Sequence, residues 1–243
     1  MNISITYCIT SEHSAIVKSL KYCALTMPIK QSYINPNIFR VDWDNLSGWT
    51  DGDVGGAISE IDPYWQLHLD CRAITLDGCA VRNKDLGSVG TGNYYVEMRI
   101  KGDTWGGFGG QAQGVYFLMG AETKRLNFFI GNGFENPSGN GIIVRSASSY
   151  ALVVSKTWDN DWHTIVFYVH NSQTDVDIWV DKSPTETADV TDADCSYATA
   201  NEGDMKIKGW GTLAGNERYH IDYVYVGDEL IQGENATFFG SNF

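Results

Sequence analysis

The sequence has no long apolar run and few basic residues, and both deficits exclude classes of partner. No segment approaches the roughly 20 apolar residues that a membrane-spanning helix needs, so we expect no membrane insertion. Lys and Arg total 17 against 30 Asp and Glu, which gives a formal net charge of −13. Because such a surface repels phosphate backbones, nucleic acid is not an expected partner. The first residues also lack the charged and apolar pattern of a secretory signal peptide.

Cysteine is scarce, with five residues and no C-x-x-C pair, so the sequence carries no zinc or thiol-redox motif. Cys71 and Cys79 flank a seven-residue segment between two expected strands, where a disulfide would bridge a hairpin. Cys8 and Cys23 offer a second pairing, and Cys195 is left over. Spacing alone leaves open whether either pair is bridged.

Proline is rare at 5 residues, whereas glycine (26) and tryptophan (8) are abundant, as in an all-β protein with many turns. From Phe39 onward, short alternating or β-branched segments follow one another with turn residues between them. About a dozen strands with almost no helix indicate a sandwich or barrel. The predicted strands are 39–43, 64–70, 79–82, 94–101, 114–119, 125–130, 141–145, 151–155, 164–170, 175–180, 205–209, 219–226 and 229–231.

The stretch 158–181 predicts the central hairpin of this fold. Residues 164–170 alternate and are rich in β-branched and aromatic side chains, and 171–174 form a polar turn cluster. The second strand has opposite chemistry on its two faces, which predicts a hairpin on a core with a solvent-facing second side. The apolar face comprises Val176, Ile178 and Val180, and the polar face comprises Asp175, Asp177 and Trp179.

The N-terminal residues follow a different pattern. Residues 3–10 alternate like a strand, and a short amphipathic helix then begins after Ser11 and ends at Pro28. We therefore divide the chain into an N-terminal strand-helix arm and linker at 1–37 and a β-sandwich at 38–243. The arm either covers one end of the sandwich or, through residues 1–35, ties subunits into a homo-oligomer.

Six phrases within residues 38–232 resemble a known superfamily: F-R-V-D-W-D-N-L-S-G-W-T, W-Q-L-H-L-D, Y-Y-V-E-M-R-I-K-G-D, D-W-H-T-I-V-F-Y-V, V-D-I-W-V-D and I-D-Y-V-Y-V. They resemble the concanavalin A-like lectin/glucanase sandwiches, which include laminin G-like modules. The resemblance implies two antiparallel sheets in a jelly roll with one concave face. Such folds occur in lectins, carbohydrate-binding modules, glycoside hydrolases, polysaccharide lyases and viral surface or tail proteins, and the fold does not choose among them.

Glycoside hydrolysis is disfavoured because the chain lacks the set of acidic residues that it needs. The resemblance implies that laminarinase-like hydrolases of this superfamily carry E-x-D-x-E on one strand, a spacing that puts the carboxylates on one face. The closest match is Ser59-Glu60-Ile61-Asp62-Pro63, which lacks the third carboxylate and contains a proline unsuited to a central strand. We regard the motif as absent.

A polysaccharide lyase is the alternative enzyme. Elimination across a uronate ring needs a group that neutralises the carboxylate and a base near the C5 proton. The resemblance implies an R-x-E-x-R strand, of which Glu97 and Arg99 match while Tyr95 replaces the first Arg. The chain would place a polar groove on the concave sheet, with Arg99 as neutraliser and Tyr168 or His170 as base. Its residues would be His68, Glu97, Arg99, Tyr168 and His170.

Aromatic residues on glycine-rich loops favour glycan binding. Sugars rest their C–H faces on aromatic rings, and side-chain amides fix their hydroxyls. The candidate binding residues are Trp105 and Phe108 on one loop, Phe134 and Asn136 on another, and Trp179 on a strand. The alternative is that these rings only fill the ends of the sandwich.

A structural Ca²⁺ is the one cofactor that the sequence suggests. Asp42 and Asp44 lie near the first sandwich strand and Asp222 on the last one, and the resembling folds often hold Ca²⁺ where such strands meet. Carboxylates and turn carbonyls suit its oxygen coordination. Asp is equally a turn former, which leaves a purely structural role open.

These observations favour a non-catalytic β-sandwich that acts outside cells, on a virion or cell surface, in glycan recognition or structural assembly. The missing carboxylate triplet and the aromatic loops motivate this hypothesis. The alternatives are a polysaccharide lyase and a purely structural assembly protein with no glycan ligand.

Overall fold

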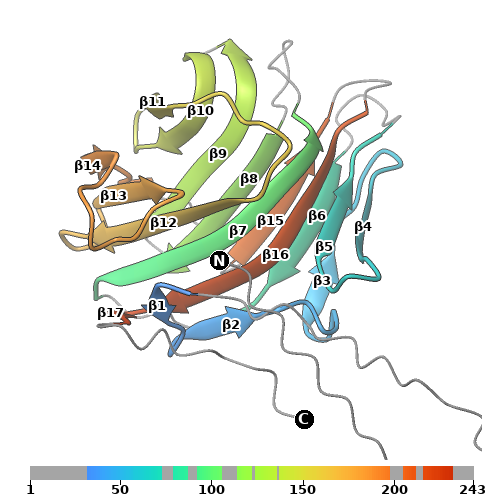
Figure 1. Ribbon diagram of the computed structural model, residues 1–243, viewed down its shortest axis with the longest axis horizontal. Helices are drawn as coiled ribbons and strands as arrows, with labels where there is room; N and C mark the ends of the chain where they lie inside the picture. Colours follow the sequence, from blue (N-terminus) through green and yellow to red (C-terminus); the bar gives the residue numbers. More distant parts are fainter. Residues whose placement is uncertain are drawn as a thin grey trace, which may run out of the picture.

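The computed structural model describes residues 32–72, 79–86, 92–105, 114–121, 124–135, 137–197, 205–211 and 216–231, without the side chains at 120–121, 124–125 and 134–135. These residues form two large antiparallel sheets that lie face to face, as predicted (Figure 1). The described part contains no helix long and apolar enough to span a bilayer. Residues 1–31 of the predicted arm at 1–37, which include Cys8 and Cys23, lie outside the described residues.

One sheet has seven strands. Its outer positions alternate with core positions along every strand, so each strand contributes one face to the core and one to the surface. The order is β11 (Tyr150–Ser155), β10 (Ser138–Arg145), β9 (Lys124–Glu135), β8 (Gly114–Ala121), β15 (Met205–Trp210), β6 (Cys79–Lys84) and β3 (Trp49–Asp51).

The other sheet has eight strands, and its main path lies in front of the seven-stranded sheet in Figure 1. The path is β14 (Val190–Asp194), β13 (Asp175–Val180), β12 (His163–His170), β7 (Tyr94–Thr104), β16 (Arg218–Gly227), β5 (Leu67–Asp70) and β4 (Ile58–Ile61). The eighth strand, β2 (Phe39–Val41), pairs with β16, and β1 (Ile34–Asn35) pairs with β17 (Glu229–Leu230) in a separate ribbon.

The predicted central hairpin is the β12–β13 pair. Its turn holds Asn171, Ser172 and Gln173 in the left-handed region, with φ of 51°, 59° and 65°. Val176 and Ile178 are fully buried in the main core, and Val180 packs against it. Across the sandwich, Phe167 of this hairpin stacks on Phe128 with ring centroids 4.1 Å apart. The hairpin therefore connects the two sheets through aromatic packing.

The outer side of the hairpin is partly covered, which corrects the prediction of a solvent-facing second side. Val166, Tyr223 and Tyr225 on this face are buried, and Ile34 of β1 packs on them. Residues 34–35 were expected in a linker, but they form a strand because these apolar outer side chains supply a surface for Ile34 to cover.

Cys71 and Cys79 do not bridge a hairpin. Both thiols are free and buried, and the strands next to them, β5 and β6, belong to opposite sheets. Burial raises the pKa of the Cys71 thiol to about 12, so this sulfur stays protonated. Cys195 is likewise buried. The question that the spacing left open is thus answered for Cys71 and Cys79, which form no disulfide.

Candidate functional site

Aromatic and basic side chains gather on the outer face of the seven-stranded sheet. Met205 and Ile207 of β15 point into the core, so the alternation directs Lys208 and Trp210 outward. The neighbouring strands add further outward side chains at matching positions of the register. We call this set the aromatic face; it comprises Tyr116, Phe129, Arg145, Tyr150, Lys208 and Trp210.

The rings of the aromatic face lie against one another. Phe129 is at the centre, with ring centroids 4.8 Å from Tyr116, 5.9 Å from Tyr150 and 6.0 Å from Trp210. The planes of Phe129 and Trp210 differ by only 13°. Both rings are half-buried, and Tyr150 is 44% exposed. The nearly parallel rings of Phe129 and Trp210, with Tyr116 and Tyr150 tilted against Phe129, provide an apolar surface that solvent reaches.

Two cations lie against these rings. The Lys208 Nζ atom is 3.8 Å from the Trp210 ring centroid. The Arg145 Cζ atom is 3.9 Å from the ring centroid of Tyr197 and 4.9 Å from that of Tyr150. Such contacts restrain the aromatic rings and place positive charge over their faces. The face is thus cationic in a chain of net charge −13.

Asn127 is a buried polar residue beside the aromatic face. It lies on β9 opposite Leu118 of β8, and its side chain is fully buried. Neither its amide nitrogen nor its amide oxygen has a hydrogen-bond partner in the structure. An unpaired buried polar group costs about 1–3 kcal/mol, so this position is costly for the fold.

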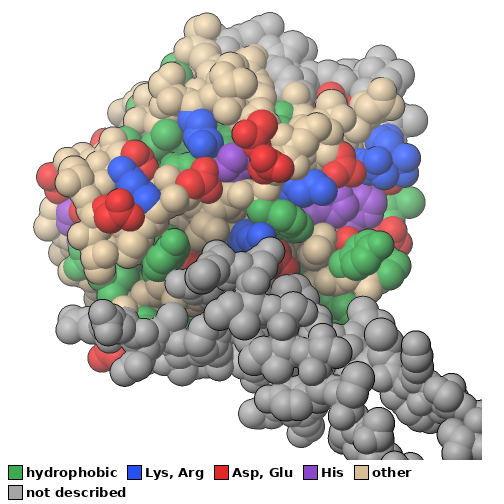
Figure 2. Space-filling view, viewed as in Figure 1, with side chains coloured by type: hydrophobic (Ala, Val, Ile, Leu, Met, Phe, Trp, Pro, Cys, Tyr) green, Lys and Arg blue, Asp and Glu red, His purple; other side chains and the backbone are tan. Residues whose placement is uncertain are grey.

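The predicted lyase residues share the outer face of the eight-stranded sheet, where Figure 2 shows a band of acidic, basic and histidine side chains. At one end, His68 stacks on His220 with ring centroids 4.8 Å apart. Burial and the neighbouring His220 lower the pKa of His68, which favours its neutral form. Arg99 pairs with Asp222 at 2.8 Å and lies over the Trp162 ring.

Glu97 does not line an open groove. Its carboxylate is fully buried and accepts hydrogen bonds from the Tyr223 hydroxyl at 2.7 Å and the Tyr33 backbone N–H at 2.8 Å. The Ser32 hydroxyl is 3.1 Å away. Burial raises the pKa of Glu97 to about 7 despite these donors. The segment that carries Ser32 and Tyr33 therefore seals this position from substrate.

Tyr168 and His170 form a group separate from His68, Arg99 and Glu97. The Tyr168 ring stacks on Tyr95 at 4.4 Å and on His170 at 5.1 Å. Tyr168 is opposite Tyr95 in the register, four residues along β7 from Arg99. At about 3.3 Å per residue, the backbone positions of Arg99 and Tyr168 are about 13 Å apart along the strand, and the two side chains contact different neighbours. The structure thus does not assemble the predicted lyase groove.

The predicted glycan-binding residues either make contacts within the fold or have no described side chain. Trp105 packs between Trp158 and Tyr219, and its indole N–H donates to the Asp159 carbonyl at 2.6 Å. Trp179 is 7% exposed and donates to the Glu186 carbonyl. Phe108 and Asn136 fall outside the described part, and Phe134 is on β9 without a described side chain.

The predicted calcium ligands do not gather. Asp42 pairs with Arg40 at 2.6 Å and accepts a hydrogen bond from the Tyr225 hydroxyl, while Asp222 pairs with Arg99. Asp44 is exposed. Among the described residues, the group whose ligand atoms all lie within 4.8 Å of one another is instead His170, Asp177 and Asp192. Asp222 is directed to Arg99 at a bulge of β16, between Ile221 and Tyr223.

The sequence analysis missed the aromatic face, although its pattern is visible in the sequence. Lys206-Ile207-Lys208-Gly209-Trp210 alternates basic or aromatic residues with core residues along β15. The second signal is Asn127-Phe128-Phe129, where adjacent phenylalanines point to opposite sides of the sheet.

Comparisons with known proteins identify the fold. No protein-family model and no curated protein matches the chain in sequence. A carbohydrate esterase from the Shiga toxin-encoding bacteriophage phi24B is similar in structure, with a TM-score of 0.54 and 14% identity over 79% of this chain and 98% of its own. A beta-1,3-glucanase from Mycobacterium marinum has a TM-score of 0.52 and 14% identity over 79% and 99% of the two chains.

A lectin is also similar to this chain in structure. Lectin I-B4 from Griffonia simplicifolia has a TM-score of 0.51 and 11% identity over 76% of this chain and 94% of its own. At these identities, structural similarity establishes architecture alone. The chain has the concanavalin A-like jelly-roll fold that its sequence phrases predicted.

Proposed function

We propose that this chain recognises a glycan through its aromatic face and does not cleave it. The observation that carries the proposal is the pair of half-buried, nearly parallel rings of Phe129 and Trp210, with the Lys208 ammonium over the Trp210 ring. Pyranose rings present apolar C–H faces that pack on such rings, while charged side chains hold hydroxyls or carboxylates. The structural neighbours named as an esterase, a glucanase and a lectin support a carbohydrate ligand.

The non-catalytic part of the proposal rests on the chemistry of the strands beneath the aromatic face. Glycoside hydrolysis uses two carboxyl groups that flank the scissile bond. None of the side chains described on β8, β9, β10, β11 and β15 is Asp or Glu. A sugar on this face would therefore meet rings, amides and cations, which bind it without supplying an acid and a nucleophile.

As part of the same proposal, the chain acts outside cells, on a virion or cell surface, where polysaccharides are exposed. The basic edge of the face favours glycans that carry carboxylates, because Lys208 and Arg145 offer positive charge beside the rings. A binding test should therefore include both neutral and uronate-containing polysaccharides.

The test measures retention of the full chain on immobilised neutral and uronate polysaccharides, with assays for reducing ends and unsaturated products on the same samples. We expect retention without cleavage, and we expect Trp210→Ala to weaken it at least about tenfold, because truncating an aromatic hot spot costs about 2 kcal/mol or more. Trp162→Ala is the matched control, since Trp162 is also half-buried but lies beside Arg99 on the other sheet. Retention of no polymer, or equal loss in both variants, would overturn the proposal.

A further inference from the structure

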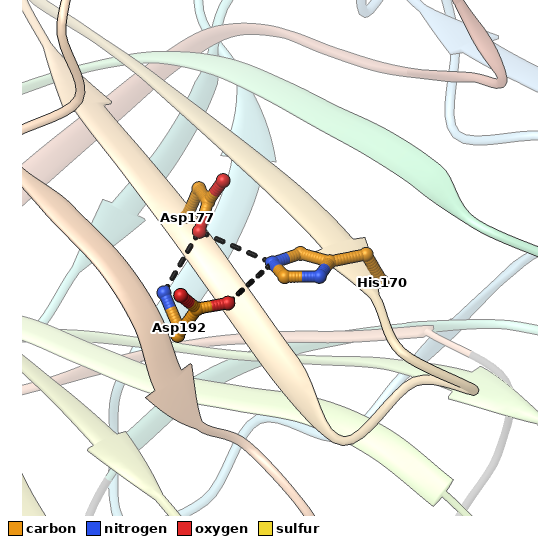
Figure 3. A group of neighbouring side chains, drawn as sticks. All are labelled: His170, Asp177 and Asp192. Carbon is orange, nitrogen blue, oxygen red and sulfur yellow. Dashed lines mark hydrogen bonds and ion pairs between the residues drawn. The ribbon is translucent and has the colours of Figure 1, made fainter.

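We propose that His170, Asp177 and Asp192 form a binding site for a divalent transition-metal ion such as Zn²⁺. The three residues come from three neighbouring strands, β12, β13 and β14, at an edge of the eight-stranded sheet. Figure 3 shows the imidazole directed at both carboxylates. The site is on the opposite sheet from the aromatic face, so it is independent of the proposed glycan recognition.

The spacing of the ligand atoms fits a small tetrahedral ion. The His170 Nε2 atom is 3.1 Å from the Asp177 Oδ1 atom and 3.7 Å from the Asp192 Oδ1 atom. Tetrahedral Zn²⁺ with bonds of about 2.0–2.1 Å places its ligand atoms about 3.3–3.4 Å apart. The two measured distances bracket that value, so an ion fits with small side-chain rotations.

The backbone holds the three side chains toward one point. The register shifts between Val176 and Ile178, where β14 pairs with β13, and Asp192 adopts φ of 52° in this region. Its backbone N–H donates to the Asp177 Oδ1 atom at 2.8 Å, which fixes one carboxylate. The Tyr168 ring stacks on His170 and limits rotation of the imidazole. Such constraints lower the cost of ordering metal ligands on binding.

The accessible side of the site is open to solvent. The side chain of His170 is 12% exposed and that of Asp177 is 21% exposed, whereas that of Asp192 is 71% exposed. An ion reaches the site from the side of Asp192, and water or an external ligand completes its coordination. This is the pattern of three protein ligands and one open position.

Local charge also favours a cation. Asp175 of β13 lies directly opposite Asp194 of β14, beside the two ligand aspartates. Like charges in that position destabilise a strand pair. Among the described residues, the ion pairs of Asp177 and Asp192 are with His170 alone, and no Lys or Arg neutralises them. A divalent ion would relieve this repulsion.

The ligand set distinguishes among ions. Ca²⁺ takes six to eight oxygen ligands, and an imidazole is foreign to that shell. One imidazole nitrogen with two carboxylate oxygens suits Zn²⁺ and its first-row neighbours. We therefore expect Zn²⁺ to bind and Ca²⁺ to bind weakly or not at all.

Calorimetric titration of the full metal-free chain with Zn²⁺, and separately with Ca²⁺, tests the site. We expect one saturable Zn²⁺ site whose affinity falls at least about tenfold in His170→Gln, since even indirect partners of a metal are worth 10–100-fold. His68→Gln is the matched control, because His68 is a partly buried histidine on the same sheet face that pairs with Glu60. We expect its affinity to match that of the unaltered chain.

Asp192→Asn provides a second test that does not depend on the folding of the histidine variant. This residue is exposed, so we expect an unchanged fold by circular dichroism and weakened Zn²⁺ binding. Absence of a saturable Zn²⁺ site, or equal affinity in the unaltered chain, His170→Gln and Asp192→Asn, would contradict the proposal. Glycan retention by His170→Gln separates this outcome from failure of the glycan proposal, because it depends on the other sheet.

Discussion

Replacing Asn127 by Leu should stabilise the protein, contrary to the usual effect of a core substitution. The Asn127 side chain is fully buried and neither polar atom of its amide has a partner. Leucine has the same number and branching of side-chain heavy atoms as asparagine and removes both unpaired groups. It faces Leu118 in the register of β8 and β9, so it gains an apolar neighbour.

The magnitude follows from the groups removed. Each unsatisfied buried group costs about 1–3 kcal/mol. Imperfect packing of the replacement side chain lowers the free energy of unfolding by up to about 1.5 kcal/mol. The two groups together cost about 2–6 kcal/mol, so after the packing loss we expect the free energy of unfolding to rise by about 0.5–4.5 kcal/mol. In a chain of this size, each kcal/mol raises Tm by about 2–4 °C.

Urea denaturation of the unaltered chain and of Asn127→Leu measures this difference, with an unchanged m value as the check on two-state behaviour. Asn132→Leu is the matched control on the same strand, since its amide donates to the Trp158 carbonyl at 3.0 Å and accepts from the Trp158 N–H at 2.9 Å. This control should lose about 1–3 kcal/mol. If both variants lost stability to the same degree, the reasoning about Asn127 would be refuted.

Three other predictions concern Glu97, Phe167 and the N-terminal arm. Burial raises the pKa of Glu97 to about 7 from 4.5, so the folded state holds this proton more tightly than the unfolded state. The contribution of that proton to the free energy of unfolding is complete below pH 4.5 and is lost as the pH rises toward about 7. Thermal melts at several pH values should therefore show a Tm that depends less on pH in Glu97→Gln than in the unaltered chain. Identical dependence of Tm on pH in the two proteins would contradict this. Phe167→Ala removes the ring that stacks on Phe128 and should cost about 3–5 kcal/mol by urea denaturation, whereas a cost below about 1 kcal/mol would show that the sheets do not pack through it. If residues 1–35 tie subunits together, light scattering should show an oligomer that becomes a monomer when residues 1–31 are deleted and Ser32 and Tyr33 are retained; an unchanged mass would remove this segment as the cause.

The fold was predictable because most strands carry alternation strong enough to be read locally. β12 and β13 place β-branched and aromatic residues on the core side, so both their positions and their inner faces were predicted. The short strands β3, β4 and β14 were missed. Thr50, Ser59 and Thr191 show how polar these strands are, and their pairing comes from neighbouring strands rather than from their own sequence.

The candidate sites were less predictable because they depend on contacts between distant segments. Glu97 read as a surface residue on an alternating strand, but its burial comes from Ser32 and Tyr33, more than 60 residues away. His170 was selected as a base, and only the register of β13 and β14 brings Asp177 and Asp192 to it. Alternation predicts which face a side chain takes and does not predict what covers that face.

The most direct measurement of the central claim compares retention of the unaltered chain, Trp210→Ala and Trp162→Ala on a panel of immobilised polysaccharides. The account predicts that at least one polymer retains the unaltered chain and Trp162→Ala equally, while Trp210→Ala elutes early and all three stay folded by circular dichroism. Full retention of Trp210→Ala, or no retention of the unaltered chain by any polymer, would contradict glycan recognition on the aromatic face.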